Sequence, residues 1–228
     1  MAFPDFFDPE FLSRVVSEAG SPCFVYDEQA ILDQIRTLKK FPAPFGLFPR
    51  YAMKSCPTRA IVALITGQGV GIDASSGYEV DRAIRAGVDP SAISLSSQEL
   101  PDDFAQWIEK GVKLNACSLS QLRAYGERFP GTRVGLRFNP GLGSGGTAKT
   151  NVGGPSSSFG IWHEKADEAQ SILDEFSLTA ERIHTHIGSG SDPAVWQRTA
   201  QLSLALVGKF TDAETLNLGG GYKVARMP

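Results

Sequence analysis

The stretch VGIDASSGYEVDRAIRAGVDPSAISLS, residues 70–96, carries the pattern that decides the fold. Its first part, Val70–Ala74, is a short apolar run typical of a buried strand. Ser76 and Glu79 then form a Ser-x-x-Glu capping box, which predicts that a helix begins here. Gly87 supplies the left-handed residue on which such a helix commonly ends, and a second apolar run follows. The stretch therefore predicts a strand, a helix and a second strand that is parallel to the first.

The same alternation recurs along the chain. We predict seven strands, at Gly46–Met53, Val70–Ala74, Ala92–Ser96, Lys113–Ala116, Val134–Phe138, Ile183–Ile187 and Thr215–Leu218. Further helix starts are indicated by two capping boxes and by an Asp-Pro pair, and further helix ends by two glycines: Ser96 with Glu99, Ser118 with Gln121, Asp192 with Pro193, Gly111 and Gly131. Strands that alternate with helices indicate an α/β fold, either a (β/α)8 barrel of the TIM type or an open doubly wound sheet.

Two features favour the barrel. The first four repeats are evenly spaced, and polar candidates follow many different strands instead of gathering at one crevice. A barrel of this type typically needs about 250 residues, whereas this chain has 228 and shows no eighth strand. We therefore expect residues 1–228 to form one barrel domain that stops before strand eight. The short run Cys23–Tyr26 precedes the repeats and is expected to lie outside them.

The composition excludes several classes of protein. Lysine and arginine total 22 against 25 acidic residues, and no basic cluster suggests a nucleic-acid partner. No segment approaches the roughly 20 apolar residues of a membrane helix. The acidic, proline-interrupted N-terminus does not resemble a signal peptide, so we expect a cytoplasmic protein. The three cysteines form no CxxC pair and are expected to be reduced thiols.

One connection is longer than an ordinary barrel loop. Residues 141–160, GLGSGGTAKTNVGGPSSSFG, are rich in glycine and serine. This composition fits a flexible linker. It equally fits a mobile loop over an active site, because the segment follows the C-terminal end of a predicted strand.

Lys54, in YAMKSCP, follows the first predicted strand. A lysine at a strand end is usually a solvated charge. At a barrel mouth beside Tyr51 and Met53, however, its amine is expected to be partly desolvated, which would lower its pKa and let it attack a carbonyl. A Schiff-base lysine is therefore a hypothesis for this position.

Two further motifs suit an anion. In LNLGGGYK, Gly219, Gly220 and Gly221 follow the seventh strand and form either a tight turn or a phosphate site. We favour the phosphate site, because loops after strands seven and eight of such barrels commonly bind phosphate. Ser189, one strand earlier, adds a hydroxyl that could grip the same group.

His184 and His186 lie two residues apart on one strand and therefore share a face, which suits ring stacking, metal ligation or simple packing. Only His163 remains as a further histidine, so a metal site is disfavoured. Asp73 is either a member of a structural ion pair or part of the site, and Arg137 is expected near the anionic parts of a cofactor.

A reactive lysine, a phosphate cradle and a histidine for ring stacking together describe a site for pyridoxal 5'-phosphate. YAMKSCP, IDASSGYEV, RFNPGLGSG, GGPSSSFGI, HTHIGSG and LNLGGGYK also stand in the order found in the ornithine, arginine and diaminopimelate decarboxylases. The chain resembles this group, which has an alanine racemase-like barrel, over about residues 21 to 223. Its RFNPG, SFGI and HTHIGSG motifs are most similar to the diaminopimelate decarboxylases.

The resemblance implies a role for each candidate. Lys54 would form the Schiff base with pyridoxal 5'-phosphate, and His186 would stack on its ring. Ser189 and Gly219–Gly221 would hold the phosphate, with Arg137 and Asp73 nearer the edge of the site. The implied reaction is decarboxylation of meso-diaminopimelate in lysine biosynthesis, by a carboxy-lyase that forms a homodimer with shared active sites.

The sequence departs from the group at Ser55, Cys56 and Ser158, and it lacks the group's strand-eight acid and C-terminal β domain. It is therefore expected to be the N-terminal part of a longer enzyme, and this chain alone is expected to have weak activity or none. Two alternatives remain: another decarboxylase of the group, acting on ornithine, lysine, arginine or carboxynorspermidine, or a non-catalytic barrel that binds pyridoxal phosphate.

Overall fold

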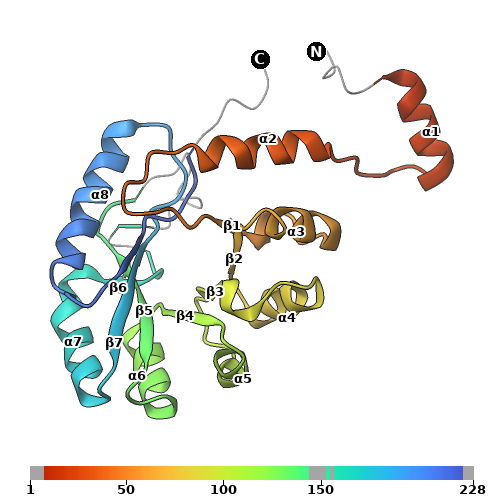
Figure 1. Cartoon of the computed structure of the whole chain (residues 1–228). Coiled ribbons are helices and arrows are strands. Elements are labelled where there is room, and N and C mark those ends of the chain that lie inside the picture. The colour runs from red at the N-terminus through yellow and green to blue at the C-terminus, as the bar shows by residue number, and fades with distance from the viewer. Residues whose placement is uncertain (1–7, 144–152, 155–156, 223–228) are drawn as a thin grey trace.

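The structure is a computed structural model, and it describes residues 8–143, 153–154 and 157–222 (Figure 1). Its strands are β1 Arg50–Ala52, β2 Gly71–Ala74, β3 Ile93–Leu95, β4 Lys113–Ala116, β5 Arg133–Asn139, β6 Ile161–Trp162, β7 Thr179–Thr185 and β8 Thr215–Asn217. Its α-helices are α1 Pro9–Ala19, α2 Glu28–Lys39, α3 Arg59–Thr66, α4 Gly77–Arg85, α5 Phe104–Glu109, α6 Leu119–Arg128, α7 Ala166–Glu175 and α8 Pro193–Val207.

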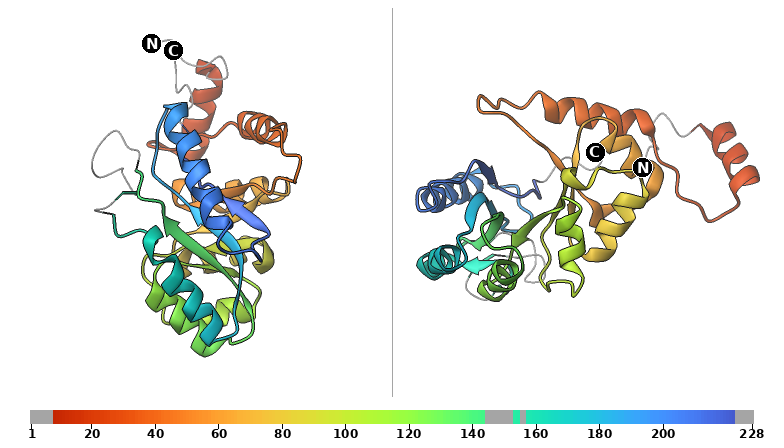
Figure 2. Two further views of the ribbon diagram at one scale, coloured as in Figure 1. Left: turned by 90° about the vertical axis from the view of Figure 1, so that its left-hand side faces the viewer. Right: turned by 60° about the horizontal axis from the view of Figure 1, so that its bottom comes forward.

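The sheet follows the order of the chain. Its seven main strands run β1-β2-β3-β4-β5-β7-β8, every pairing between them is parallel, and the two-residue β6 adds to β5 beside this path. A doubly wound sheet would reverse its strand order at a switch point, and this sheet does not. The strands curl into a half-barrel, with helices α3 to α8 along its outer side (Figure 2). The predicted barrel-type fold with seven strands is therefore confirmed.

Alternation along each strand separates two environments. Leu136 and Phe138 of β5 and Ile183 of β7 are fully buried in the apolar layer between the sheet and the helices. Because successive side chains of a strand point to opposite faces, Arg137 and His184 lie on the inner face. These two residues stand opposite each other in the parallel register of β5 and β7. The inner face of the half-barrel is therefore polar.

Most predicted helix signals are confirmed. Ser76 caps α4 by accepting from the Glu79 backbone N–H at 3.2 Å, and Ser118 caps α6 by accepting from Gln121 at 3.1 Å. Asp192 caps α8 in the same way, with Pro193 in the first turn. Three predicted helix-end glycines adopt a positive φ, namely Gly87, Gly111 and Gly131.

The helix start predicted at Ser96 is wrong. Helix α5 begins only at Phe104, with Asp103 before it. A helix starting at Ser96 would place Pro101 at its fifth position, where the missing N–H and the ring both disrupt helical hydrogen bonding. The Ser96 hydroxyl instead belongs to the polar interior of the half-barrel.

Two strand predictions need correction. The first strand spans only Arg50–Ala52, because Gly46 adopts a φ of 98° before it and the chain turns into a 3₁₀ helix at Met53–Ser55. The sixth predicted strand, β7, runs from Thr179 to Thr185, earlier than expected, because its polar first half pairs with β5 from Arg133 onward.

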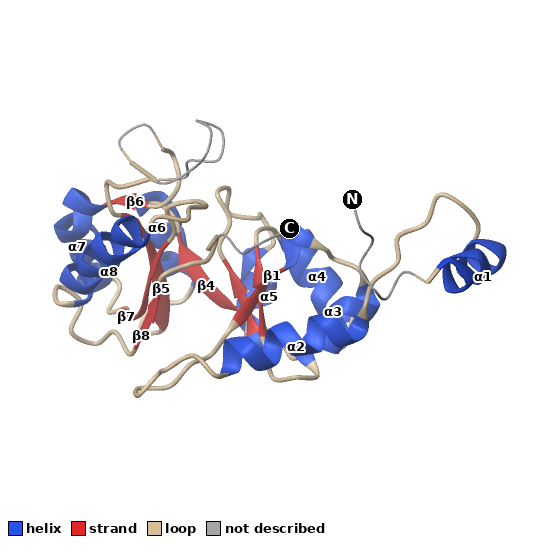
Figure 3. Ribbon diagram, turned by 90° about the horizontal axis from the view of Figure 1, so that it is seen from above, coloured by secondary structure: helices blue, strands red, loops and turns tan. Residues whose placement is uncertain are grey.

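The N-terminal elements lie apart from the half-barrel. Figure 3 shows α1 at a distance from the sheet and α2 passing over α3 and the first strands, and α2 contributes the buried Ile35 to a small cluster with α3. Residues 23–26 lie outside the strands, and Phe24 is 90% exposed. None of the helices in the described part of the chain is both long and apolar enough to span a membrane.

Gly126 generates a prediction about how α6 packs on α7. A Cβ atom at this position would lie 2.5 Å from the Phe176 ring and 2.9 Å from its Cβ. Alanine has the higher helix propensity, but we expect overpacking to prevail, so Gly126→Ala lowers the free energy of unfolding by about 1 kcal/mol in urea titrations. In a Phe176→Ala background the same change should stabilise the protein. A stabilising effect in the wild-type background would contradict this packing.

Candidate active site

Four of the predicted site residues come from the C-terminal ends of different strands. Lys54 lies in the 3₁₀ turn after β1, Asp73 lies in β2, Arg137 lies near the end of β5, and His186 directly follows β7. The positive charges of Arg137 and Lys54 both act to lower the pKa of Asp73, against a larger raising effect of burial. The same two charges act on His186. The structure thus brings these four side chains into one electrostatic neighbourhood.

Lys54 does not show the predicted desolvation. Its side chain is exposed, although Met53 beside it is completely buried. The reason is topological, since β1 is an edge strand of the described sheet and pairs with β2 on one side only. Lys54 therefore stands at an open edge of the half-barrel mouth.

His186 is a neutral imidazole. Burial, and then the nearby charges of Arg137 and Lys54, lower its pKa from 6.5 to about 4. Since the unfolded chain binds this proton more readily, the imidazole contributes stability above pH 6.5 that is lost as the pH falls towards 4. A neutral ring can lie against an aromatic cofactor without placing a charge on its face.

The glycine triplet closely contacts His186. A Cβ atom at Gly219 would lie 2.5 Å from His186 Nδ1, and the Gly220 N–H approaches the same nitrogen at 3.5 Å. Gly219 and Gly221 have φ values of 71° and 99°, a region that favours glycine. The Gly219 N–H donates to Asn217 Oδ1 at 2.7 Å, which fixes the start of the turn. The triplet is therefore a shaped turn on which side chains would collide.

The Ser189 segment lies beside this turn. The Gly190 N–H donates to the Gly221 carbonyl at 3.1 Å, and Gly190 bridges to Tyr222 in parallel fashion. A Cβ atom at Gly221 would lie 3.1 Å from the Ser189 Cα. The predicted proximity of Ser189 to the triplet is thus present, and the hydroxyl is exposed at the same rim.

Arg137 is buried at 7% exposure, and its guanidinium carbon lies 5.1 Å from the centre of the Phe159 ring. Phe159 belongs to the end of the long connection 141–160. Asn139 anchors both sides of this connection, accepting from the N–H groups of Gly141 and Gly154 at 3.1 and 3.0 Å. Residues 144–152 and 155–156, on which the linker and mobile-loop interpretations bear, lie outside the described residues.

The sequence analysis missed a second layer of polar residues beneath this mouth. Arg182, Asn115 and Ser94 are buried on the inner face, and Ser96 lies with them instead of capping a helix. The available signal was the alternation of polar residues at every second strand position. Within the described ranges, no group of three or more His, Cys, Asp or Glu side chains is arranged to hold a metal ion.

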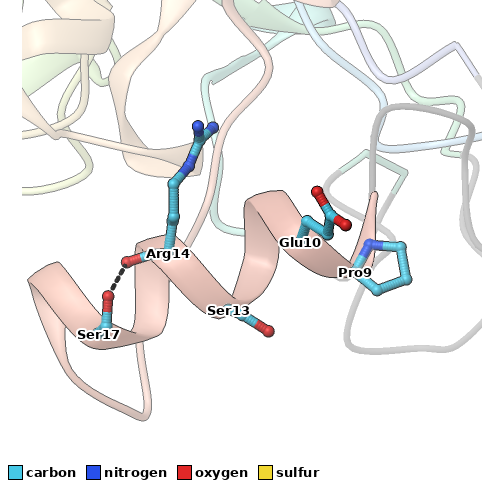
Figure 4. A pocket seen from close by; sticks show the side chains of 5 residues that line it. All are labelled: Pro9, Glu10, Ser13, Arg14 and Ser17. Carbon is cyan, nitrogen blue, oxygen red and sulfur yellow. Dashed lines mark hydrogen bonds between the residues drawn. The ribbon is translucent and has the colours of Figure 1, made fainter.

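A shallow hollow elsewhere does not compete with this site. Figure 4 shows that it is lined by one helix alone, with Pro9, Glu10, Ser13, Arg14 and Ser17 along α1. The Ser17 hydroxyl donates to the Arg14 carbonyl of the same helix at 2.7 Å. None of the predicted site residues lines it.

The mouth fits a phosphate-bearing aldehyde. The glycine turn leaves a cradle that a Cβ atom would fill, an exposed amine stands at the same mouth, and the neutral His186 ring contacts the turn. Glycine turns let backbone N–H groups approach an anion closely. These groups have the chemistry needed to hold the phosphate, the ring and the aldehyde of pyridoxal 5'-phosphate.

The fold and this site define a pyridoxal-type barrel, and the chain belongs to a family of that class. Residues 28–227 match the family described as pyridoxal-dependent decarboxylase, pyridoxal binding domain. The chain is 36% identical to the diaminopimelate decarboxylase of Escherichia coli strain K12, over 94% of this chain and 51% of that enzyme. It is 33% identical to the Streptomyces coelicolor diaminopimelate decarboxylase, over 99% of this chain and 51% of that enzyme.

Solved structures agree with this assignment. A crystal structure of diaminopimelate decarboxylase superposes with a TM-score of 0.87 at 35% identity, covering 96% of this chain and 52% of that one. The Helicobacter pylori enzyme complexed with L-lysine shares the fold at 20% identity, with a TM-score of 0.78 over 92% of this chain and 55% of that one. The chain spans about half the length of the relatives it matches.

The electrostatic coupling at the mouth generates a prediction. Replacing Arg137 with Gln should raise the pKa of His186, because a nearby positive charge is removed while burial still opposes protonation. NMR titration of the imidazole signals measures this directly. Arg128→Gln is the matched control, since Arg128 is paired with Glu109 on the surface and should leave the His186 midpoint unchanged. An unchanged midpoint in Arg137→Gln would contradict the coupling.

Proposed function

We propose that this chain binds pyridoxal 5'-phosphate and supplies the cofactor-binding half of an amino-acid decarboxylase. The observation that carries the proposal is the convergence of an exposed amine, a neutral histidine and a glycine turn at one barrel mouth. Lys54 would bind the cofactor aldehyde, and His186 would lie against its ring. Ser189 and Gly219–Gly221 would hold its phosphate.

When bound, pyridoxal 5'-phosphate supplies an aldehyde that captures amines and a ring that accepts the electron pair of a bond broken at the substrate α-carbon. Lys54 contributes an amine that can bind the aldehyde carbon and, when free, carry a proton at Nζ. His186 orients the ring through contact without adding a charge. The Arg137 and Asp73 charges, close together, set the electrostatic environment of that amine and of the cofactor's anionic groups.

We further propose meso-diaminopimelate as the substrate and lysine and carbon dioxide as the products. Relatives at 33 and 36% identity that align over nearly the whole chain are diaminopimelate decarboxylases, which supports this choice over ornithine, lysine, arginine or carboxynorspermidine. The sequence motifs that resemble the same group give independent support. In this proposal the enzyme works in the cytoplasm as a homodimer.

Cofactor binding is tested by chemical trapping. The chain is incubated with pyridoxal 5'-phosphate, reduced with sodium borohydride and mapped by mass spectrometry. We expect the pyridoxyl label on Lys54, and its loss in Lys54→Ala. Lys110→Ala is the matched control, because Lys110 lies over the Trp107 ring away from the mouth and should leave labelling unchanged. A label spread over surface lysines, equal in both variants, would refute the proposed site.

The substrate is tested by incubating the loaded chain with each candidate amino acid and measuring carbon dioxide and amine products. Lysine formed from meso-diaminopimelate, at a rate abolished by Lys54→Ala, supports the proposal. Faster release from ornithine, arginine, lysine or carboxynorspermidine would replace the proposed substrate. No product from any of them, with Lys54 labelled, would mean that this chain acts as a non-catalytic carrier.

A further inference from the structure

A continuous chain of hydrogen bonds crosses the interior of the half-barrel below the mouth. Arg182 Nε of β7 donates to Asn115 Oδ1 of β4 at 2.8 Å. Asn115 Nδ2 donates to the hydroxyls of Ser94 and Ser96 at 2.9 and 2.8 Å. The Ser96 oxygen lies 3.5 Å from Asp73 Oδ1 and also 3.5 Å from His184 Nδ1.

The direction of this chain is fixed by its first member. A guanidinium can only donate hydrogen bonds, so the atom of Asn115 that faces Arg182 must be the carbonyl oxygen. The amide nitrogen therefore faces Ser94 and Ser96 and gives one hydrogen to each. Both serine oxygens act as acceptors towards Asn115.

Ser96 then has one hydrogen left to donate and one lone pair left to fill. An ionised Asp73 only accepts, so the hydroxyl hydrogen belongs to Asp73. The remaining lone pair suits an N–H on His184 Nδ1. With a bare Nδ1, two acceptors would compete for a single hydrogen, and one of these buried groups would lose its partner.

The backbone is shaped to allow this arrangement. A Cβ atom on Gly135 of β5 would lie 2.1 Å from Asn115 Oδ1 and 3.0 Å from Arg182 Nε. The absence of a side chain at Gly135 is what lets Arg182 reach Asn115 across β5, which lies between β4 and β7 in the sheet.

We infer that Ser96 and Asn115 are positioning residues, which deliver a directed hydrogen bond from the Arg182 guanidinium to the Asp73 carboxylate and hold His184 in its Nδ1–H form. This role concerns the proposed cofactor site, because Asp73 interacts with the charge of Lys54. Ser96 thereby favours the ionised form of Asp73 beneath the amine that would bind the aldehyde.

The surroundings of Asp73 define what a titration will report. Groups from the neighbouring strands and turns that act on it or respond to its charge are Arg50, Lys54, Ser96, Cys117 and Arg137. Burial raises the pKa of Asp73, while the cations and the Ser96 hydroxyl lower it. His184 is buried, and burial together with Arg137, His186, Arg182 and Arg50 holds its pKa well below 6.5, so it stays neutral throughout.

The decisive experiment is a carboxyl ¹³C NMR titration of Asp73 in the chain without cofactor, with Asp73→Asn used for assignment. Ser96→Ala should move the Asp73 midpoint upward by about one pH unit, because a hydrogen bond to the charged form is lost. Ser94→Ala is the matched control. It loses an equivalent bond from Asn115 on the same strand and should leave the midpoint in place. Ser96→Thr, which keeps the hydroxyl, should restore it.

Equal midpoints in Ser96→Ala and wild type, or equal shifts in Ser96→Ala and Ser94→Ala, would overturn the inference. The wild-type protein offers a second test that needs no variant to fold. Imidazole ¹⁵N spectra should show His184 with its proton on Nδ1, and a bare Nδ1 would contradict the arrangement. Borohydride labelling of Lys54 is measured separately, so an unlabelled lysine beside a confirmed Asp73 shift would refute the proposed function alone.

Discussion

The buried guanidinium of Arg182 is the constraint to which the interior of the half-barrel is fitted. Its residue is only 4% exposed, and an uncompensated buried charge would be strongly destabilising. Three partners compensate it: Asn115 Oδ1, the Leu114 carbonyl and the Glu181 carboxylate, at 2.8, 3.2 and 2.9 Å. Gly135 provides the space for these contacts. The polar interior thus depends on one cation whose partners come from neighbouring strands.

The parallel register carries this constraint to the mouth. Arg182, His184 and His186 occupy alternate positions of one strand and its end, so they rise along the inner face from the interior to the rim. At the rim, His186 contacts the turn formed by Gly219 and Gly220, and it senses the charges of Lys54 and Arg137. Since apolar residues take the alternate positions, packing against the helices fixes the height and direction of each polar side chain.

Local signals in the sequence were sufficient for the elements and their order. Capping boxes such as Ser76 with Glu79 act within a few residues, and strands joined by helices leave few topologies. Ser96 was misassigned because its pattern looks like a cap, whereas its actual partners come from other strands. The exposure of Lys54 was equally hidden, since it depends on which strand lies beside β1. Local patterns do not contain such pairings.

The central claim is that Lys54 and the glycine turn face one common ligand position. The most direct measurement is a titration of the ¹⁵N-labelled chain with pyridoxal 5'-phosphate, followed through backbone amide signals. The account predicts that signals from Lys54, Ser189, Gly220 and Gly221 shift together and saturate at the same cofactor concentration. Shifts that saturate separately at the two places, or that are confined to other parts of the chain, would contradict it.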